Sequence, residues 1–215
     1  MRSRNLSAIE QLIAGYRRFR SGYYEENRER LTDLAHVGQS PQIAVVACCD
    51  SRVDPAVITD STPGDLFVVR NVANLIPPCE GKGTWHGTSA ALQFAVSCLE
   101  VEHVIVLGHA RCGGIRSLLE GQGERQENNF IADWMSIAEE ARKQALARTD
   151  LETFDQRIHA CELSSIQISL SNLLTFPWIR ERVEKQTLQL HGWYYDMQSG
   201  ELLEVDASGS TVALS

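Results

Sequence analysis

Three short apolar runs, rich in β-branched residues, divide the first half of the chain. They are QIAVVAC at residues 42–48, LFVVRN at 66–71 and HVIVLGH at 103–109. Each run ends at polar or glycine-containing residues, and such runs are typical of strands buried on both faces of a parallel sheet. We therefore predict three core strands at these positions.

A helical pattern lies between the second and third of these strands. In residues 88–100, Ala91, Phe94, Ala95 and Cys98 recur at i, i+3, i+4 and i+7, so their side chains share one face of a helix. A strand, a helix and another strand in this order indicate a βαβ crossover.

Apolar residues also recur at helical spacing near the N-terminus and in the second half of the chain. A surface helix is predicted over residues 6–20 from the spacing of Leu6, Ile9, Leu12 and Ile13. Basic side chains stand at the end of this stretch. Further helices are expected at residues 113–119, 130–146 and 161–174, with Pro177 interrupting the last run. Two extended stretches around a turn in residues 187–206 indicate a β-hairpin.

These elements predict an α/β fold. We expect a central, mainly parallel β-sheet flanked by helices, with an N-terminal helical arm and a C-terminal helical region that ends in a β-hairpin. The chain has 215 residues and shows neither a repeat nor a linker-like stretch. We therefore expect one domain over residues 1–215, including the arm at residues 1–36.

Composition excludes some kinds of partner. The formal net charge is −8, which argues against nucleic acid because phosphate binding depends on Lys and Arg. No apolar run approaches the ~20 residues of a membrane helix, so we expect no membrane partner. The basic start of the chain leads into an amphipathic stretch and not into an apolar signal core, so we expect a cytoplasmic protein.

Two polar motifs follow the first and third predicted strands. Residues 48–52 read CCDSR and residues 108–114 read GHARCGG. In an open parallel sheet, the loops at the carboxyl ends of neighbouring strands converge on one crevice. The two motifs are therefore expected to meet, although 61 residues separate Cys48 from His109.

Together the motifs supply a set of zinc ligands. A catalytic zinc site uses three protein ligands, and two cysteines with one histidine are a known set. Cys48, His109 and Cys112 provide it, whereas Cys49 follows a ligand on an extended chain and should point elsewhere, as a small packed thiol. Two alternatives remain: a core histidine beside a buried thiol, and a metal-free Cys48–His109 nucleophile.

A charged pair stands beside the expected ligands. Asp50 and Arg52 are two residues apart at the strand exit, so an extended turn can direct both to one side and let them pair. Arg52 would then hold Asp50 away from the metal and leave the fourth coordination position for water. Without Arg52, Asp50 could itself bind the zinc.

The segments CCDSRVDP, DLFVVRNVAN and GHARCGG resemble the β class of carbonic anhydrases. The resemblance covers roughly residues 38–119. It implies one Zn²⁺ per chain at Cys48, His109 and Cys112, a gating dyad of Asp50 and Arg52, and reversible hydration of carbon dioxide to bicarbonate and a proton by hydroxide on the metal. It also implies a homodimer or a multiple of dimers, with pockets at the subunit boundary.

The segment GQSP at residues 38–41 resembles the plant-type branch of that class. This resemblance implies that Gln39 hydrogen-bonds the bound substrate or product, and that Phe67 and Val72 line the carbon dioxide pocket. We also expect the backbone N–H of Gly113 or Gly114 to orient bicarbonate, because glycine permits a close approach of the backbone.

Two rival functions share the same motifs. A zinc hydrolase acting on a related linear molecule, such as carbon disulfide, would use the same ligands. A non-catalytic scaffold that keeps the fold and the zinc would be expected to have lost Asp50 or Arg52, and both are present.

Overall fold

The computed structural model of the chain describes residues 6–80, 86–121 and 129–214. It divides into two compact units, Met1–Gln39 and Ser40–Ser215. The first unit consists of the helices α1 (Ala8–Ser21), α2 (Tyr23–Glu26) and α3 (Arg28–Val37), and none of their residues is buried. The helix predicted at residues 6–20 is α1, and a reciprocal capping box of Ser7 and Glu10 fixes its start.

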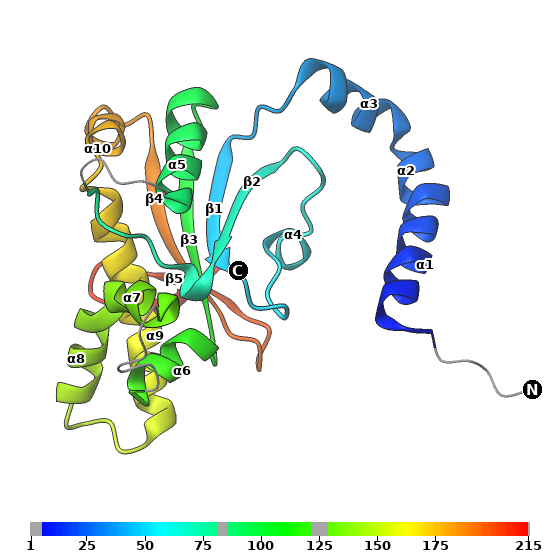
Figure 1. The fold of residues 1–215 in the computed structure, drawn as a ribbon. Helices are drawn as coiled ribbons and strands as arrows, with labels where there is room; N and C mark the ends of the chain where they lie inside the picture. The colour runs from blue at the N-terminus through cyan, green and yellow to red at the C-terminus, as the bar shows by residue number, and fades with distance from the viewer. Residues whose placement is uncertain (1–5, 81–85, 122–128, 215) are drawn as a thin grey trace, which may run out of the picture. The chain divides into compact units, whose positions relative to one another are not determined.

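The second unit is built on a six-stranded sheet with the strand order β2-β1-β3-β4-β5-β6. The first four strands in this order are parallel, and the last two pair antiparallel. The sheet therefore confirms the α/β class with a mainly parallel centre (Figure 1). The strands are β1 (Ile43–Cys48), β2 (Leu66–Asn71), β3 (His103–His109), β4 (Gln189–Tyr195), β5 (Leu202–Val205) and β6 (Thr211–Ala213).

One face of the sheet packs against helices. The main apolar core joins side chains of β1 and β3 to α5 (Gly87–Gln93), the π-helical segment η2 (Phe94–Cys98), α9 (Phe154–Leu173) and α10 (Pro177–Glu184). Gly108 lies where α9 crosses β3, and a Cβ atom there would lie 2.7 Å from a side-chain atom of Ile166. Glycine is therefore required for this close packing of helix on strand.

A second core lies under the carboxyl ends of β1 and β3. It is formed by α6 (Gly113–Leu119), α7 (Phe130–Met135), α8 (Glu139–Ala147), part of α9 and the turn η1 (Val72–Asn74). Cys48 and Cys112 are buried members of this core. The helix expected at residues 130–146 is two helices joined by the 3₁₀ turn η3 (Ser136–Ala138).

Three details differ from the sequence-based expectation. Pro177 begins α10 at its first turn, where its missing N–H needs no partner, although we expected it only to end a helix. Helix α9 starts at Phe154, seven residues earlier than expected, behind a capping box of Thr153 and Gln156. Strand β6, which extends the predicted hairpin, was not expected.

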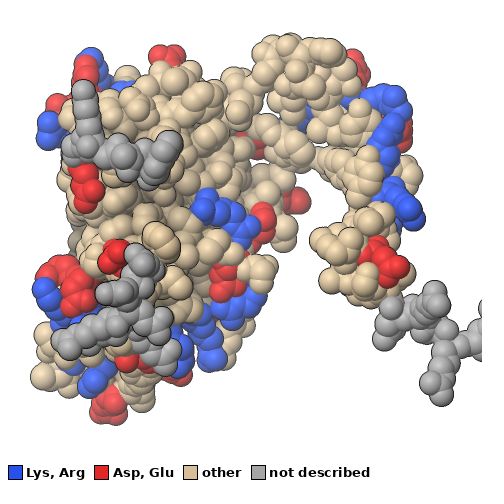
Figure 2. All heavy atoms as spheres, in the orientation of Figure 1, with Lys and Arg blue, Asp and Glu red and all other residues tan. Residues whose placement is uncertain are grey.

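On the visible face of the second unit, acidic and basic side chains are interspersed (Figure 2). Across the described ranges, none of the helices is both long enough and apolar enough to span a bilayer.

Candidate metal centre

The predicted ligands meet because β1 and β3 are neighbours in register. Ala47 pairs with Leu107, so the two parallel strands end at the same edge of the sheet. Cys48 is the last residue of β1, and His109 is the last residue of β3. The sheet thus brings these two residues together although they are far apart in the sequence.

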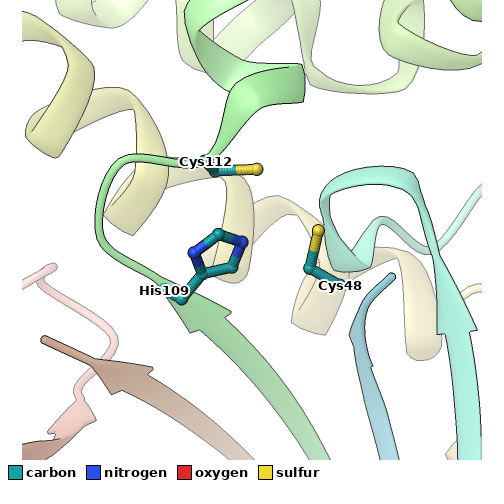
Figure 3. A group of neighbouring side chains, drawn as sticks. All are labelled: Cys48, His109 and Cys112. Carbon is teal, nitrogen blue, oxygen red and sulfur yellow. The ribbon is translucent and has the colours of Figure 1, made fainter. Parts of the chain in front are cut away.

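A tight turn directs Cys112 back to the same point. Arg111 adopts a left-handed conformation with φ of 56°, which is uncommon for a residue other than glycine. The turn ends at Cys112, the N-cap residue of α6. Figure 3 shows the Cys112 and Cys48 sulfur atoms on one side of the His109 ring.

The three side chains form a compact buried cluster. One ligand atom from each of Cys48, His109 and Cys112 lies within 4.8 Å of the others. Their exposed fractions are 5%, 1% and 2%, respectively. Two sulfur atoms and one nitrogen atom at this separation match the donor set of a catalytic zinc site, which leaves one coordination position open.

A hydrogen bond to the main chain fixes the His109 ring in the tautomer that binds a metal through Nε2. Its Nδ1 lies 2.9 Å from the Ala110 carbonyl oxygen, which can only accept, so Nδ1 carries the hydrogen atom. Its Nε2 therefore presents a lone pair toward the cluster, and it is buried without a hydrogen-bond partner. A buried nitrogen rarely stays unpaired in a native fold, so the residues present fit a metal ion at this point.

The contact between the two ligand thiols shifts their pKa values in opposite directions: it lowers the pKa of Cys48, and together with burial it raises the pKa of Cys112. The pKa of Cys48 lies well below that of a free cysteine, chiefly because the Cys112 thiol donates a hydrogen bond to it. A thiolate is the form of cysteine that binds metal. Cys49 lies outside the cluster, as expected, but it is exposed and not packed.

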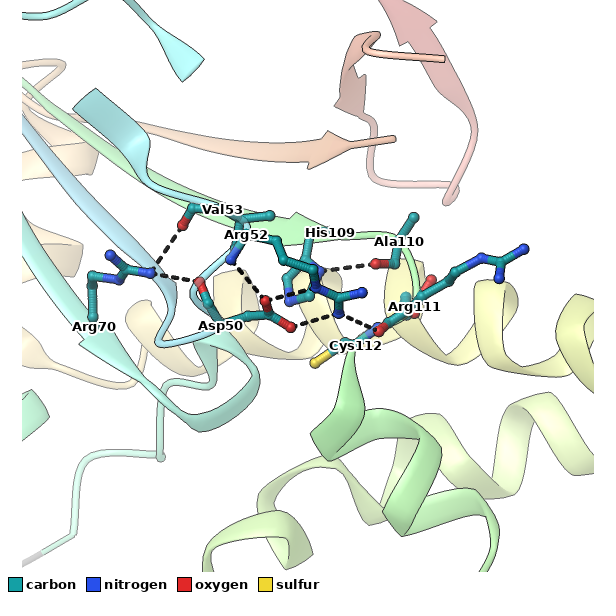
Figure 4. A network of polar contacts seen from close by, with 9 residues as sticks. Asp50, Arg52, Val53, Arg70, His109, Ala110, Arg111 and Cys112 are labelled. Carbon is teal, nitrogen blue, oxygen red and sulfur yellow. Dashed lines mark hydrogen bonds and ion pairs between the residues drawn. The ribbon is translucent and has the colours of Figure 1, made fainter. Parts of the chain in front are cut away.

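Asp50 and Arg52 pair beside the cluster (Figure 4). The Arg52 side chain donates from Nε to Oδ1 at 2.9 Å and from Nη2 to Oδ2 at 2.7 Å, and the Arg52 backbone N–H donates to Oδ1 at 3.0 Å. Arg52 Nη2 also donates to the Arg111 carbonyl oxygen at 3.2 Å, which ties the dyad to the loop between His109 and Cys112. The Arg52 guanidinium holds the pKa of Asp50 far below its usual range.

The expected substrate residues occupy different places. Val72 packs against Gly114 in the second core, next to the loop that carries Cys112. Phe67 pairs with Ala44, four residues before Cys48, and is thus ~13 Å along the sheet from the cluster of its own chain. Gln39 is exposed at the end of the first unit. A Cβ atom on Gly113 would meet nothing within 4 Å, so its backbone faces open space.

A buried polar chain behind Cys112 was not predicted. The Cys112 backbone N–H donates to Glu162 Oε1 at 2.8 Å, and the Tyr194 hydroxyl donates to Glu162 Oε2 at 2.8 Å. His159 Nδ1 lies 3.0 Å from the same hydroxyl. Burial raises the pKa of Glu162 to about 7. The signal was present, because Glu162 stands four residues from both Ile158 and Ile166, on the buried face of α9.

Comparisons with known proteins give one family. A family model described as "Carbonic anhydrase" matches residues 43–202. The protein "Beta carbonic anhydrase 5, chloroplastic" of Arabidopsis thaliana is 39% identical over 195 residues, which are 91% of this chain and 64% of that protein. The chain thus spans less than two thirds of that relative.

Solved structures agree with the sequence comparison. The structure of the β-carbonic anhydrase CcaA is 36% identical, with a TM-score of 0.89 over 96% of this chain and 92% of that chain. A structure described among two tetrameric β-carbonic anhydrases of Sordaria macrospora is 26% identical, with a TM-score of 0.79 over 95% of this chain and 98% of that chain.

Proposed function

The chain belongs to the β-carbonic anhydrase family, and from that membership we propose that it catalyses the reversible hydration of carbon dioxide to bicarbonate and a proton. The observation that carries the proposal is the buried, unpaired Nε2 of His109 beside two cysteine sulfur atoms. One Zn²⁺ per chain would satisfy all three atoms.

The ligands and the dyad have separate tasks. Cys48, His109 and Cys112 would hold the ion, and the Ala110 carbonyl keeps the imidazole in the binding tautomer. A zinc ion held there would lower the pKa of a coordinated water to about 7 and so would supply a nucleophile for carbon dioxide near neutral pH. Asp50, kept ionised by Arg52, is a hydrogen-bond acceptor that can orient a donor at the open position.

Substrate contacts are proposed from both sides of a subunit boundary. Within one chain, the open backbone of Gly113 can approach bicarbonate, and Val72 offers an apolar contact beside the cluster. Phe67 lies too far along its own sheet to join them. We assign Phe67 and Gln39 to the pocket of a partner subunit.

An exposed apolar stripe supports a dimer or a multiple of dimers. Ile9, Leu12 and Tyr16 on α1 are 66%, 71% and 62% exposed, and apolar side chains at this spacing form one face of the helix. A second copy of the chain would bury that face. Similar enzymes of Sordaria macrospora are described as tetrameric. The cytoplasmic location stays a prediction, and the similar Arabidopsis protein is named as chloroplastic.

A pair of adjacent cysteines tests the proposed function. Cys48→Ser removes a ligand, whereas Cys49→Ser changes its exposed neighbour, which lies outside the cluster. We expect Cys48→Ser to lose bound zinc and hydration activity in a stopped-flow assay, and Cys49→Ser to keep both. Equal activity in the two variants, or a native protein inert toward carbon dioxide, would contradict the proposal.

A further inference from the structure

The loop that carries the dyad is held from the neighbouring strand by Arg70 of β2. Its Nε donates to the Cys48 carbonyl oxygen at 3.0 Å, and its Nη2 donates to the Asp50 carbonyl oxygen at 2.7 Å and to the Val53 carbonyl oxygen at 3.0 Å. Figure 4 shows Arg70 reaching this loop from the side opposite His109. One side chain therefore fixes three carbonyl groups of residues 48–53.

The same guanidinium also reaches the end of the loop. Arg70 Nη1 donates to Asp54 Oδ2 at 3.0 Å, and Asp54 Oδ1 accepts from the Ala56 backbone N–H at 3.0 Å, which caps α4 (Pro55–Ile58). Only arginine offers donors in a planar fork that can make such a set of bonds at once. The loop is thus anchored from Cys48 to the first turn of the next helix.

Besides Arg70, two backbone hydrogen bonds hold the loop: the Cys49 N–H donates to the Asn71 carbonyl oxygen at 2.8 Å, and the Val53 N–H donates to the Asp50 carbonyl oxygen at 3.2 Å. The Arg52 side chain is 53% exposed, and besides Asp50 it contacts the Arg111 carbonyl oxygen. Residues 49–54 follow β1 and have no strand pairing of their own. The orientation of the Asp50 main chain therefore decides whether its carboxylate faces Arg52 or turns toward the three ligand atoms.

We propose that Arg70 is a positioning residue that keeps Asp50 paired with Arg52 and away from the metal position. This inference rests on the proposed function for its kinetic consequence, but its geometric consequence is independent of activity. When Arg70 is shortened to a side chain without the fork, the loop loses its anchor and Asp50 leaves Arg52. A displacement of about 1 Å at a catalytic group can lower a rate constant by about 100-fold.

The decisive variant is Arg70→Lys, and the chain supplies a matched control. Arg182 of α10 donates to the carbonyl oxygens of Val96 at 2.9 Å and Thr187 at 2.7 Å, at the edge of the sheet where β4 begins. Arg182→Lys therefore removes an equivalent clamp far from the dyad. We expect both variants to lose similar thermal stability and to keep bound zinc, and only Arg70→Lys to lower kcat, by about 10-fold to 100-fold.

A double-mutant cycle separates positioning from general destabilisation. If Arg70 acts through the dyad, Arg70→Lys should change kcat by less than about twofold in an Asp50→Asn background, because coupled residues are not additive. A crystal structure of Arg70→Lys should show the Asp50–Arg52 bonds broken. An equal loss of kcat in both backgrounds, or an intact dyad in that crystal, would overturn the proposal.

Two further results can be told apart from a failure of the proposal. If the native protein does not hydrate carbon dioxide, the proposed function fails, and the crystal of Arg70→Lys still decides the geometric claim. If Arg70→Lys does not fold, Asp54→Asn removes one charged contact of Arg70 and keeps a good helix cap. Asp54→Asn should then lower kcat about twofold in the native background and leave the kcat of Asp50→Asn unchanged. An unchanged kcat in the native background would overturn the proposal.

Discussion

Arg52 donates hydrogen bonds to both oxygen atoms of the Asp50 carboxylate, from Nε to Oδ1 at 2.9 Å and from Nη2 to Oδ2 at 2.7 Å. Such a bidentate pair fixes the plane of the carboxylate as well as its charge. An amide has only one acceptor oxygen, so it cannot accept both of these hydrogen bonds in the same way. The pair is therefore sensitive to a substitution that barely changes shape.

Asp50→Asn tests this pair directly. We expect kcat for carbon dioxide hydration to fall by about 100-fold with zinc content unchanged, since the acceptor beside the cluster is weakened while the ligands stay in place. The control is Asp155→Asn, which removes the exposed carboxylate that Arg116 contacts at 3.4 Å. Asp155→Asn should match the native rate in a stopped-flow assay, and a full rate in Asp50→Asn would show that the dyad has no catalytic task.

Two adjacent glycines should respond in opposite ways. A Cβ atom on Gly114 would lie 3.0 Å from Val72 Cγ1, 3.2 Å from Ala73 Cβ and 3.3 Å from Met135 Sδ, whereas one on Gly113 would meet nothing within 4 Å. Overpacking of this kind lowers the free energy of unfolding by about 1–3 kcal/mol, although alanine's better helix propensity offsets up to about 1 kcal/mol. We expect Gly114→Ala to unfold at lower temperature.

Gly113→Ala should leave stability unchanged or slightly higher. Its methyl group would instead occupy the open space that we assign to bicarbonate, so kcat/KM should fall by about 10-fold. Calorimetry and the hydration assay on both variants give the comparison. Native activity in Gly113→Ala would remove this residue from the substrate site.

The buried chain behind Cys112 predicts a pH dependence of stability. Burial lowers the pKa of His159, which faces the Tyr194 hydroxyl and the Asp196 carboxylate. In the unfolded chain His159 takes up a proton near pH ~6.5, but in the folded chain it does so only at lower pH. The free energy of unfolding contributed by His159 is therefore fully present above pH ~6.5 and is lost as the pH falls below it.

Denaturant unfolding at pH 7.5 and pH 5.5 measures this contribution. Glu162, whose pKa is raised to about 7, contributes in the opposite direction in every variant, so the change in stability from pH 7.5 to pH 5.5 should be less unfavourable in His159→Asn than in the native protein. His36→Asn, which changes an exposed histidine of α3, should lose as much as the native protein. The same loss in all three proteins would show that His159 does not titrate differently on folding.

Much of the central fold could be predicted because its strands are continuous apolar runs. The strands expected at residues 66–71 and 103–109 have those bounds, and β1 starts one residue later than expected. The meeting of Cys48 with His109 followed from the rule that parallel strands end at one edge. The close spacing of His109 and Cys112 required only a turn, which Arg111 supplies.

The residues behind the site could not be found in the same way. Arg70 and Glu162 act through contacts that span 22 and 50 residues in the sequence, and nothing local specifies their partners. A charged residue inside a strand is usually solvated, and Arg70 lies at an exposed position of β2. The periodicity of α9 places Glu162 on its buried face, but the hydrogen bonds of both residues needed the folded chain.

We propose that Cys48, His109 and Cys112 together hold one catalytic zinc ion. The test is to titrate metal-free protein with Zn²⁺ and to measure the hydration rate after each addition. We predict that activity rises linearly, reaches a plateau at one equivalent per chain, and is abolished again by a chelator. Full activity in protein without zinc, removed by thiol alkylation but indifferent to chelators, would contradict the account and favour a metal-free cysteine nucleophile.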